Sequence, residues 1–261
     1  MYDARAPRGE DAMRRTTTIA TLVSVLLAAV LAVPSTARAE ERPSRWGGYG
    51  HGFAGVLLGD LGGQGYGLAA STALGDGAGP SSFAGMLGGG GRARLGRYLM
   101  LGGRGFAVIA PPKQGIHGSA RFLGGGGGLD AAFVAYDDDR WLVYPYLGVL
   151  GLGVELDVDS SSPAPRRIGD ARIEPEARVQ LESGFAMIEL GAGAQRIVFG
   201  DPSGGVMVGM ELGFLYSVRV SPWQIDGVEV QGLGGPSLNG GYLRLTVGGG
   251  GAHTLRRRRG S

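Results

Sequence analysis

The 261-residue sequence contains no cysteine, so no disulfide can hold the fold, and stability has to come from packing and backbone pairing. Lysine is nearly absent as well, because Lys113 is the only one and arginine carries almost all of the positive charge. The formal net charge is only +2, which gives no basis for a nucleic-acid partner. No segment after residue 39 has 18 consecutive apolar residues, which argues against a helical membrane span there.

Glycine is what the sequence has in excess. With 53 glycines and 13 prolines in 261 residues, these two types make up about a quarter of the chain, a share that reaches into the low-complexity range. Disordered chains, however, combine such compositions with low hydrophobicity, and here 43% of the residues are hydrophobic. The composition therefore favours a folded, glycine-rich protein.

Residues 1–39 predict a cleaved secretory signal peptide. Two arginines follow Met13, a second candidate start, and an apolar run occupies residues 19–33. Residues 37–39 (ARA) fit the small-x-small pattern of a cleavage site. The apolar run is shorter than the roughly 20 residues of a membrane-spanning helix, which favours removal over a retained anchor. We therefore expect the mature chain to begin at Glu40 and to lie beyond the inner membrane.

Beyond residue 40 the dominant pattern is alternation with a period of two, as in a β-strand. In residues 206–220 one face is wholly apolar, and the other contains glycine and Glu211. Residues 141–157 place Leu142 to Leu156 on one face and Gly151 to Asp157 on the other. Both segments exceed the usual strand of about 5–6 residues and suffice for the 9–11 residues of a transmembrane strand.

Further strands are predicted with the same alternation, and short and long connections alternate between them. The register slips near Ile188, which indicates a bulge or the end of an element. The short connections are 95–97 and 137–140, and the long polar ones are 111–119 and 158–176. The additional strands are 83–94, 98–110, 120–136, 177–193 and 239–249, with a first strand at either 48–59 or 64–75.

Export, alternating strands rich in glycine and aromatic residues, and alternating loop lengths together resemble a small Gram-negative outer-membrane β-barrel of the OmpA-like, porin-type kind. The resemblance is one of pattern and covers most of residues 46–250. It implies an all-β fold: a single antiparallel up-and-down barrel of about eight strands at residues 40–250, followed by a basic tail at 251–261. Ten strands result if 48–59 and 64–75 both pair and 195–200 adds another.

The face opposite the apolar one carries charges of both signs. In an eight-stranded barrel the interior is just wide enough to be filled by side chains, and buried charges need partners. We therefore expect a network of internal salt bridges that plugs the lumen, with a narrow polar passage as the alternative. The expected lumen residues are Arg92, Arg94, Arg104, Asp130, Glu155, Asp157, Arg178, Glu182, Glu211, Arg219 and Arg244.

Motifs for other chemistry are weak. Gly50 to Gly55 match G-x-G-x-x-G, but the preceding strand and following helix of a dinucleotide site are missing. The run at 137–139 (DDD) fits a solvated turn better than a calcium loop. The three histidines, His51, His117 and His253, are scattered and give no metal-ligand spacing. We therefore expect no cofactor, no metal and no catalytic activity.

The sequence thus predicts an outer-membrane barrel with a structural or surface-interaction role. Its partners would be outer-membrane lipid and a surface ligand or cell-wall polymer, and the sequence gives no indication of the oligomeric state. The alternative is a soluble lipocalin-like barrel, periplasmic or secreted, that binds a small apolar ligand. A third interpretation, based on His117 beside Ser119, is a barrel enzyme that acts on lipid. A membrane barrel requires the apolar face outside, and a face of glycine and charge would make a poor soluble core.

Overall fold

The computed structural model describes residues 45–61, 81–138, 140–161, 165–168, 170–174, 177–201, 203–233 and 237–254. All of them belong to a compact unit that spans Pro43–Ser261. The predicted signal peptide and the alternative first strand at 64–75 lie outside the described residues. Within the described ranges, no helix is long and apolar enough to cross a membrane.

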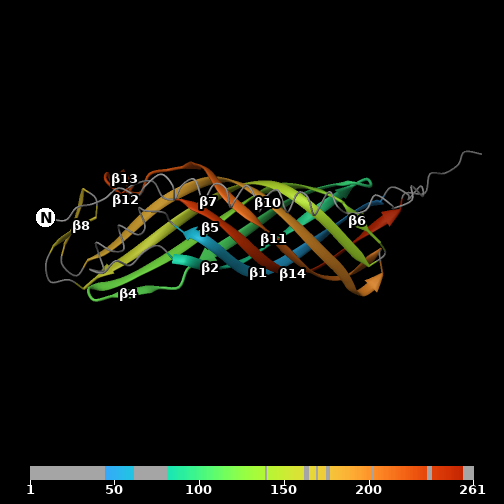
Figure 1. The fold of residues 1–261 in the computed structure, drawn as a ribbon, viewed down its shortest axis with the longest axis horizontal. Coiled ribbons are helices and arrows are strands. Elements are labelled where there is room, and N and C mark those ends of the chain that lie inside the picture. Colours follow the sequence, from blue (N-terminus) through green and yellow to red (C-terminus); the bar gives the residue numbers. More distant parts are fainter. Residues whose placement is uncertain are drawn as a thin grey trace, which may run out of the picture. The chain divides into compact units, whose positions relative to one another are not determined.

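Eight long antiparallel strands form a closed barrel (Figure 1). Each strand pairs with the next, and the last pairs with the first from Arg45 opposite Thr254 to Leu61 opposite Leu238, so the ring closes. The fold class predicted from the sequence is therefore confirmed. The strands are β1 (Arg45–Leu61), β2 (Ser81–Leu95), β3 (Leu99–Ile109), β5 (Gly118–Phe133), β7 (Trp141–Ser160), β10 (Arg178–Asp201), β11 (Gly204–Val220) and β14 (Leu238–Thr254).

The strand count follows the lower of the two predicted numbers. The segment 195–200 continues β10 and is not a separate strand, so the closed ring of described strands has eight members. Close to the predicted slip at Ile188, the register between β10 and β11 shifts between Ala186 and Met187. β14 runs on to Thr254, so the first residues of the predicted tail belong to the barrel wall.

The two ends of the barrel differ in their connections. At one end, here called the short-turn end, residues 96–98, 134–140 and 202–203 join the strands. At the other, the long-loop end, the connections 110–117, 161–177 and 221–237 carry small strands of their own (Figure 1). These are β4 (Lys113–Gly115), β8 (Arg166–Ile168), β9 (Ala171–Ile173), β12 (Gln224–Ile225) and β13 (Val228–Glu229), whereas β6 (Tyr136–Asp137) lies at the short-turn end.

The stagger of the strands sets the width of the barrel. Paired residues followed around the ring from Gly47 return to β1 at Leu57, a displacement of about ten residues per circuit. A closed barrel with such a stagger has strands tilted by about 35–45° to its axis. With eight strands, the interior has room for side chains and little else.

Apolar side chains fill the half of the interior next to the long-loop end. Leu57, Phe122, Leu156 and Leu181 point inward there and are almost fully buried. The long connections add further buried side chains to the same cluster, among them Trp223. This half of the barrel is therefore packed like the core of a soluble protein.

Candidate functional site: a ring of charges inside the barrel

Three arginines and three carboxylates meet in the middle of the interior, and each comes from a different strand. Their ion pairs alternate in sign around a closed ring. Arg92 on β2 contacts Asp130 on β5 at 2.5 Å and Glu211 on β11 at 2.6 Å. Arg104 on β3 contacts Asp130 at 2.8 Å and Glu189 on β10 at 3.0 Å. Arg244 on β14 closes the ring, at 2.9 Å from Glu189 and 2.8 Å from Glu211.

Burial explains why the ring has to be complete. All six side chains are at most 2% exposed, so water cannot solvate their charges. Each charge has at least two opposite charges beside it, since Arg104 and Glu211 also approach each other at 3.7 Å, and the six together are neutral. Removing one partner of a buried ion pair typically costs about 3–5 kcal/mol because a charge is then left uncompensated. The ring is thus one unit that joins six of the eight strands.

Tyrosines extend the ring on both sides. The Tyr49 and Tyr144 hydroxyls accept hydrogen bonds from Arg92 at 3.2 and 3.0 Å, and Tyr144 donates to Glu211 at 2.9 Å. Arg244 donates to the Tyr146 hydroxyl at 2.8 Å, which is itself bonded to Tyr242. All three guanidinium groups also lie over tyrosine rings, at 4.4–5.0 Å from the ring centres.

Glycines opposite the tyrosines make room for these rings. Gly191 is paired with Tyr146, and a Cβ there would lie 2.6 Å from atoms of both Tyr146 and Tyr242. Gly193 is paired with Tyr144, and a Cβ there would lie 2.5 Å from that ring. Some inward glycines therefore have a steric role, because they let large aromatic side chains lie flat across a neighbouring strand.

The structure places six of the eleven expected lumen residues in the interior. Five of them, Arg92, Arg104, Asp130, Glu211 and Arg244, belong to the ring. Arg94 lies nearer the short-turn end and pairs with Asp137 at 2.8 Å. Arg219 is on β11, but its side chain lies outside what the structure describes.

Four expected lumen residues, Glu155, Asp157, Arg178 and Glu182, lie on the outside of the barrel, so these predictions are wrong. The two acids on β7 alternate with the buried Leu156, and the two β10 residues flank the buried Leu181 on the same strand. Arg178 pairs with Asp157 at 2.8 Å on the outer face. These side chains belong to strand segments that extend toward the long-loop end, where the inner face is apolar and the outer face is charged.

The sequence interpretation missed Glu189 and the tyrosines. Glu189 lies just after the predicted slip, and on β10 the alternation in fact continues through Phe185, Met187 and Glu189 without a break. Tyr144 and Tyr146 share the apolar face of residues 142–156, which the sequence pattern predicts to be outside, but the structure places this face inside the barrel. The uninterrupted period of two through residues 185–195 was the available signal for Glu189.

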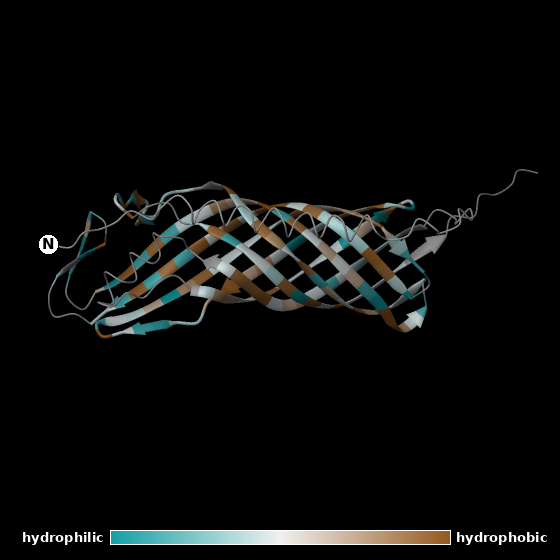
Figure 2. Cartoon of the chain, in the orientation of Figure 1, coloured by the Kyte–Doolittle hydropathy of each residue, from teal (hydrophilic) through white to brown (hydrophobic). Residues whose placement is uncertain are grey.

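The outer wall carries an apolar band. On β3 from Leu99 to Ile109, and on β7 from Trp141 to Gly153, no outward side chain is charged. Many large apolar side chains are exposed there, including Leu129 at 68% and Leu245 at 63%. Figure 2 shows these apolar positions alternating along the strands. The band matches the 9–11 residues that a tilted strand needs to cross a bilayer.

Aromatic residues border this band at the short-turn end. Tyr98 and Phe133 stack with ring centres 5.7 Å apart, and both are exposed. Arg97 lies over the ring of Tyr98, and Arg196 lies over that of Trp141, at 5.0 and 5.4 Å. Aromatic girdles at the interfaces of an apolar band are typical of transmembrane β-barrels.

The fold, the apolar outer band and the charged interior define the class of protein: a small closed β-barrel built like those of outer membranes. No protein-family model matches the chain, and no curated protein matches it. Among solved structures, Ail, the attachment invasion locus protein of Yersinia pestis, is 10% identical, with a TM-score of 0.43, covering 80% of this chain and 99% of its own. The outer membrane protein AlkL, solved in lipid bilayers, is 13% identical, with a TM-score of 0.29 and coverage of 87% and 98%.

Proposed function

We propose that this chain is an outer-membrane β-barrel with a closed lumen and a structural or surface-interaction role. The observation that carries the proposal is the uncharged outer band, which is as tall as a bilayer strand crossing and has an aromatic border. In water such a wall would be a large exposed apolar surface, which soluble monomers avoid. The lipocalin-like alternative needs the opposite arrangement, with a polar outer wall.

A closed lumen follows from what fills it. The ring of six charges lies across the middle of the interior, with its members paired at 2.5–3.0 Å. Apolar side chains pack the half next to the long-loop end, where Trp223 is only 1% exposed. Aqueous channels come with 16–18 strands, whereas eight strands leave a bore that side chains fill. We therefore expect no porin-like conductance.

The surface role rests on the long-loop end. There β7 and β10 continue past the apolar band, with charged outer positions such as Asp157, Arg178 and Glu182. A wall that is polar outside and apolar inside is suited to water, so this part of the barrel would project beyond the lipid. It would offer a sheet and three connections with small strands to a surface ligand or cell-wall polymer. The proposal includes no catalytic step and no cofactor.

Cell fractionation and planar-bilayer recording test the two halves of the proposal. We expect the protein in the outer-membrane fraction, with a folded form that needs detergent and shifts its gel mobility on heating. Recovery as a folded, detergent-free periplasmic monomer would refute the membrane location. In planar bilayers we expect silence or rare small flickers, with a 16-stranded porin in the same lipid as the positive control. Stable, large conductance steps would refute the closed lumen.

A further inference from the structure

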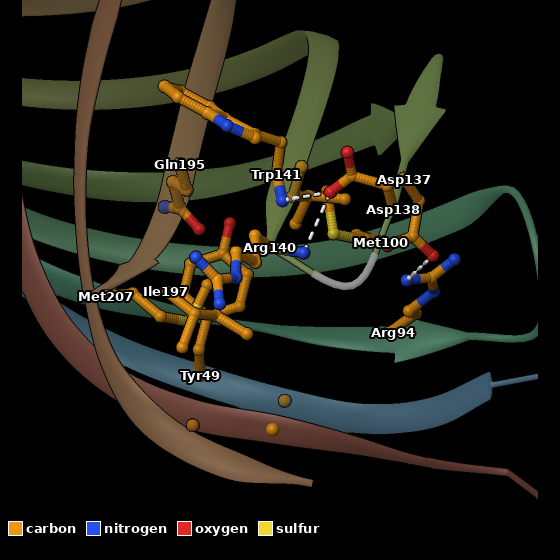
Figure 3. A pocket seen from close by; sticks show the side chains of 14 residues that line it. Tyr49, Arg94, Met100, Asp137, Asp138, Arg140, Trp141, Gln195, Ile197 and Met207 are labelled. Carbon is orange, nitrogen blue, oxygen red and sulfur yellow. Dashed lines mark hydrogen bonds and ion pairs between the residues drawn. The ribbon is translucent and has the colours of Figure 1, made fainter. Parts of the chain in front are cut away.

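A small hollow opens into the lumen at the short-turn end, between the mouth and the ring of charges (Figure 3). It is called the vestibule here and has a volume of about 60 Å3. Its walls are mainly apolar, with Met100, Leu142, Ile197 and Met207 among the lining residues. Since about 10–15 Å3 of such volume is the least that holds one water molecule, the vestibule has room for several waters or for a small organic group.

One buried polar side chain in the vestibule lacks a partner. Gln195 on β10 lines the hollow and is 2% exposed, yet its Oε1 atom has no hydrogen-bond partner among the described residues. Buried polar groups in native proteins are almost always hydrogen-bonded, and exceptions call for an explanation. The Oε1 atom itself has almost no accessible surface, so a hydrogen-bond donor brought by a ligand reaches it when the Gln195 side chain turns toward the hollow.

The mouth of the vestibule carries charges of both signs, from Arg94, Arg140, Asp137 and Asp138. Arg94 is engaged by Asp137 at 2.8 Å, and Asp138 accepts hydrogen bonds from the backbone N–H groups of Arg140 and Trp141 at 2.8 and 2.5 Å. The exposed Arg140 side chain also lines the hollow, and no described carboxylate forms an ion pair with it. Figure 3 shows Arg140 and Gln195 around the same opening. An anionic group is the natural partner for Arg140.

We infer that the vestibule binds a small carboxylate of two or three carbons with a hydroxyl or ammonium group on the carbon next to the carboxylate. The carboxylate meets Arg140 at the mouth. The hydroxyl or ammonium group enters the hollow and donates a hydrogen bond to Oε1 of Gln195. The intervening carbon packs against the methionine and isoleucine side chains. Such a ligand reaches the site from the short-turn side and does not have to pass the ring of charges.

The test uses the full chain refolded in detergent micelles and titrated with glycolate or glycine. The readout is the Gln195 side-chain amide signal in proton–nitrogen NMR spectra, identified by its loss in Gln195→Leu. Acetate is the matched probe, because it has the carboxylate without the donor. We expect glycolate to bind at least roughly tenfold more tightly than acetate, as a hydrogen bond to a buried acceptor allows.

Two variants separate the contributions of Gln195 and Arg140 to ligand binding. Gln195→Leu should reduce glycolate to the affinity of acetate, followed through the backbone amide of Ile197, whereas Arg140→Gln should weaken both probes by roughly tenfold or more. Arg196→Gln is the matched control, because Arg196 lies at the same end over the Trp141 ring and is absent from the lining. Its affinities should equal those of the unchanged protein.

Heat-modifiable gel mobility establishes that each variant is folded. If Gln195→Leu does not fold, two measurements still test whether the vestibule binds the ligand. They are the affinity of Arg140→Gln, changed at an exposed position, and the comparison of glycolate with acetate in the unchanged protein. Equal affinities for glycolate and acetate in the unchanged protein would remove the role assigned to Gln195. No response to glycolate or glycine at millimolar concentrations would mean that the vestibule holds only water, and the inference would be wrong.

Discussion

Replacing Leu212 by arginine should strongly destabilise the barrel in a bilayer. Leu212 lies at the middle of the outward apolar face of β11, which runs from Val206 to Val218, and is 38% exposed. An arginine on the lipid face of a transmembrane barrel costs about 2–4 kcal/mol at the bilayer midplane and about 0–1 near the interfaces. The expected loss at Leu212 corresponds to roughly a 30- to 700-fold change in the folding equilibrium.

Gln180→Arg is the matched control, since Gln180 also points outward but lies on β10 beyond the apolar band. There the new charge stays in water, and we expect a change of about 0–1 kcal/mol. Urea-dependent folding into lipid vesicles, followed by the heat-modifiable gel shift, measures both variants. Equal costs at the two positions would refute the assignment of the band to lipid, as would a Leu212→Arg protein that folds normally without detergent.

Three further predictions test other parts of the structure. Arg244→Met leaves Glu189 and Glu211 each with one ion-pair partner fewer, and we expect a loss of about 3–5 kcal/mol in vesicle unfolding; a loss below about 1 kcal/mol would contradict the ring as a unit. Gly128→Val should prevent folding because a Cβ there overlaps the backbone of β7, whereas Gly151→Val, with open space around it, should keep the gel shift. Lys113 should react with a membrane-impermeant amine reagent on intact cells, because partial burial lowers the pKa of its amine. Lys113→Arg should abolish this label. Labelling only after lysis would mean that the long-loop end does not face the outside of the cell.

How far the sequence predicts the fold depends on what each face of a strand meets. On β11 the sequence correctly predicted which face points outward, because lipid covers the apolar face and Glu211 and glycines occupy the other. On β7 both faces are apolar in the middle, since Leu147 and Val149 meet lipid while Leu150 and Leu152 meet the packed interior. Alternation separates the two faces of such a strand but cannot say which one is inside.

The misplaced charges have a related cause. A strand that leaves the membrane exchanges lipid for water on its outer face, so the preferred residue type on that face changes along its length. Glu155 and Glu182 lie beyond that change, and a single rule for the whole strand assigned them to the lumen. The ring itself was only partly predictable, because which charges meet depends on the register of six strands that are far apart in the sequence.

The alternating ring also has a consequence for the order in which the barrel assembles. Its members come from strands between β2 near the start of the chain and β14 at its end, so the ring is incomplete until β14 arrives with Arg244. A partly formed sheet would hold Glu189 and Glu211 with one counter-charge missing, and its first and last strands would have unpaired edges at the same time. Docking of β14 between β11 and β1 satisfies the backbone and the charges in a single event. We therefore expect closure to be all-or-none, with no stable intermediate of seven strands.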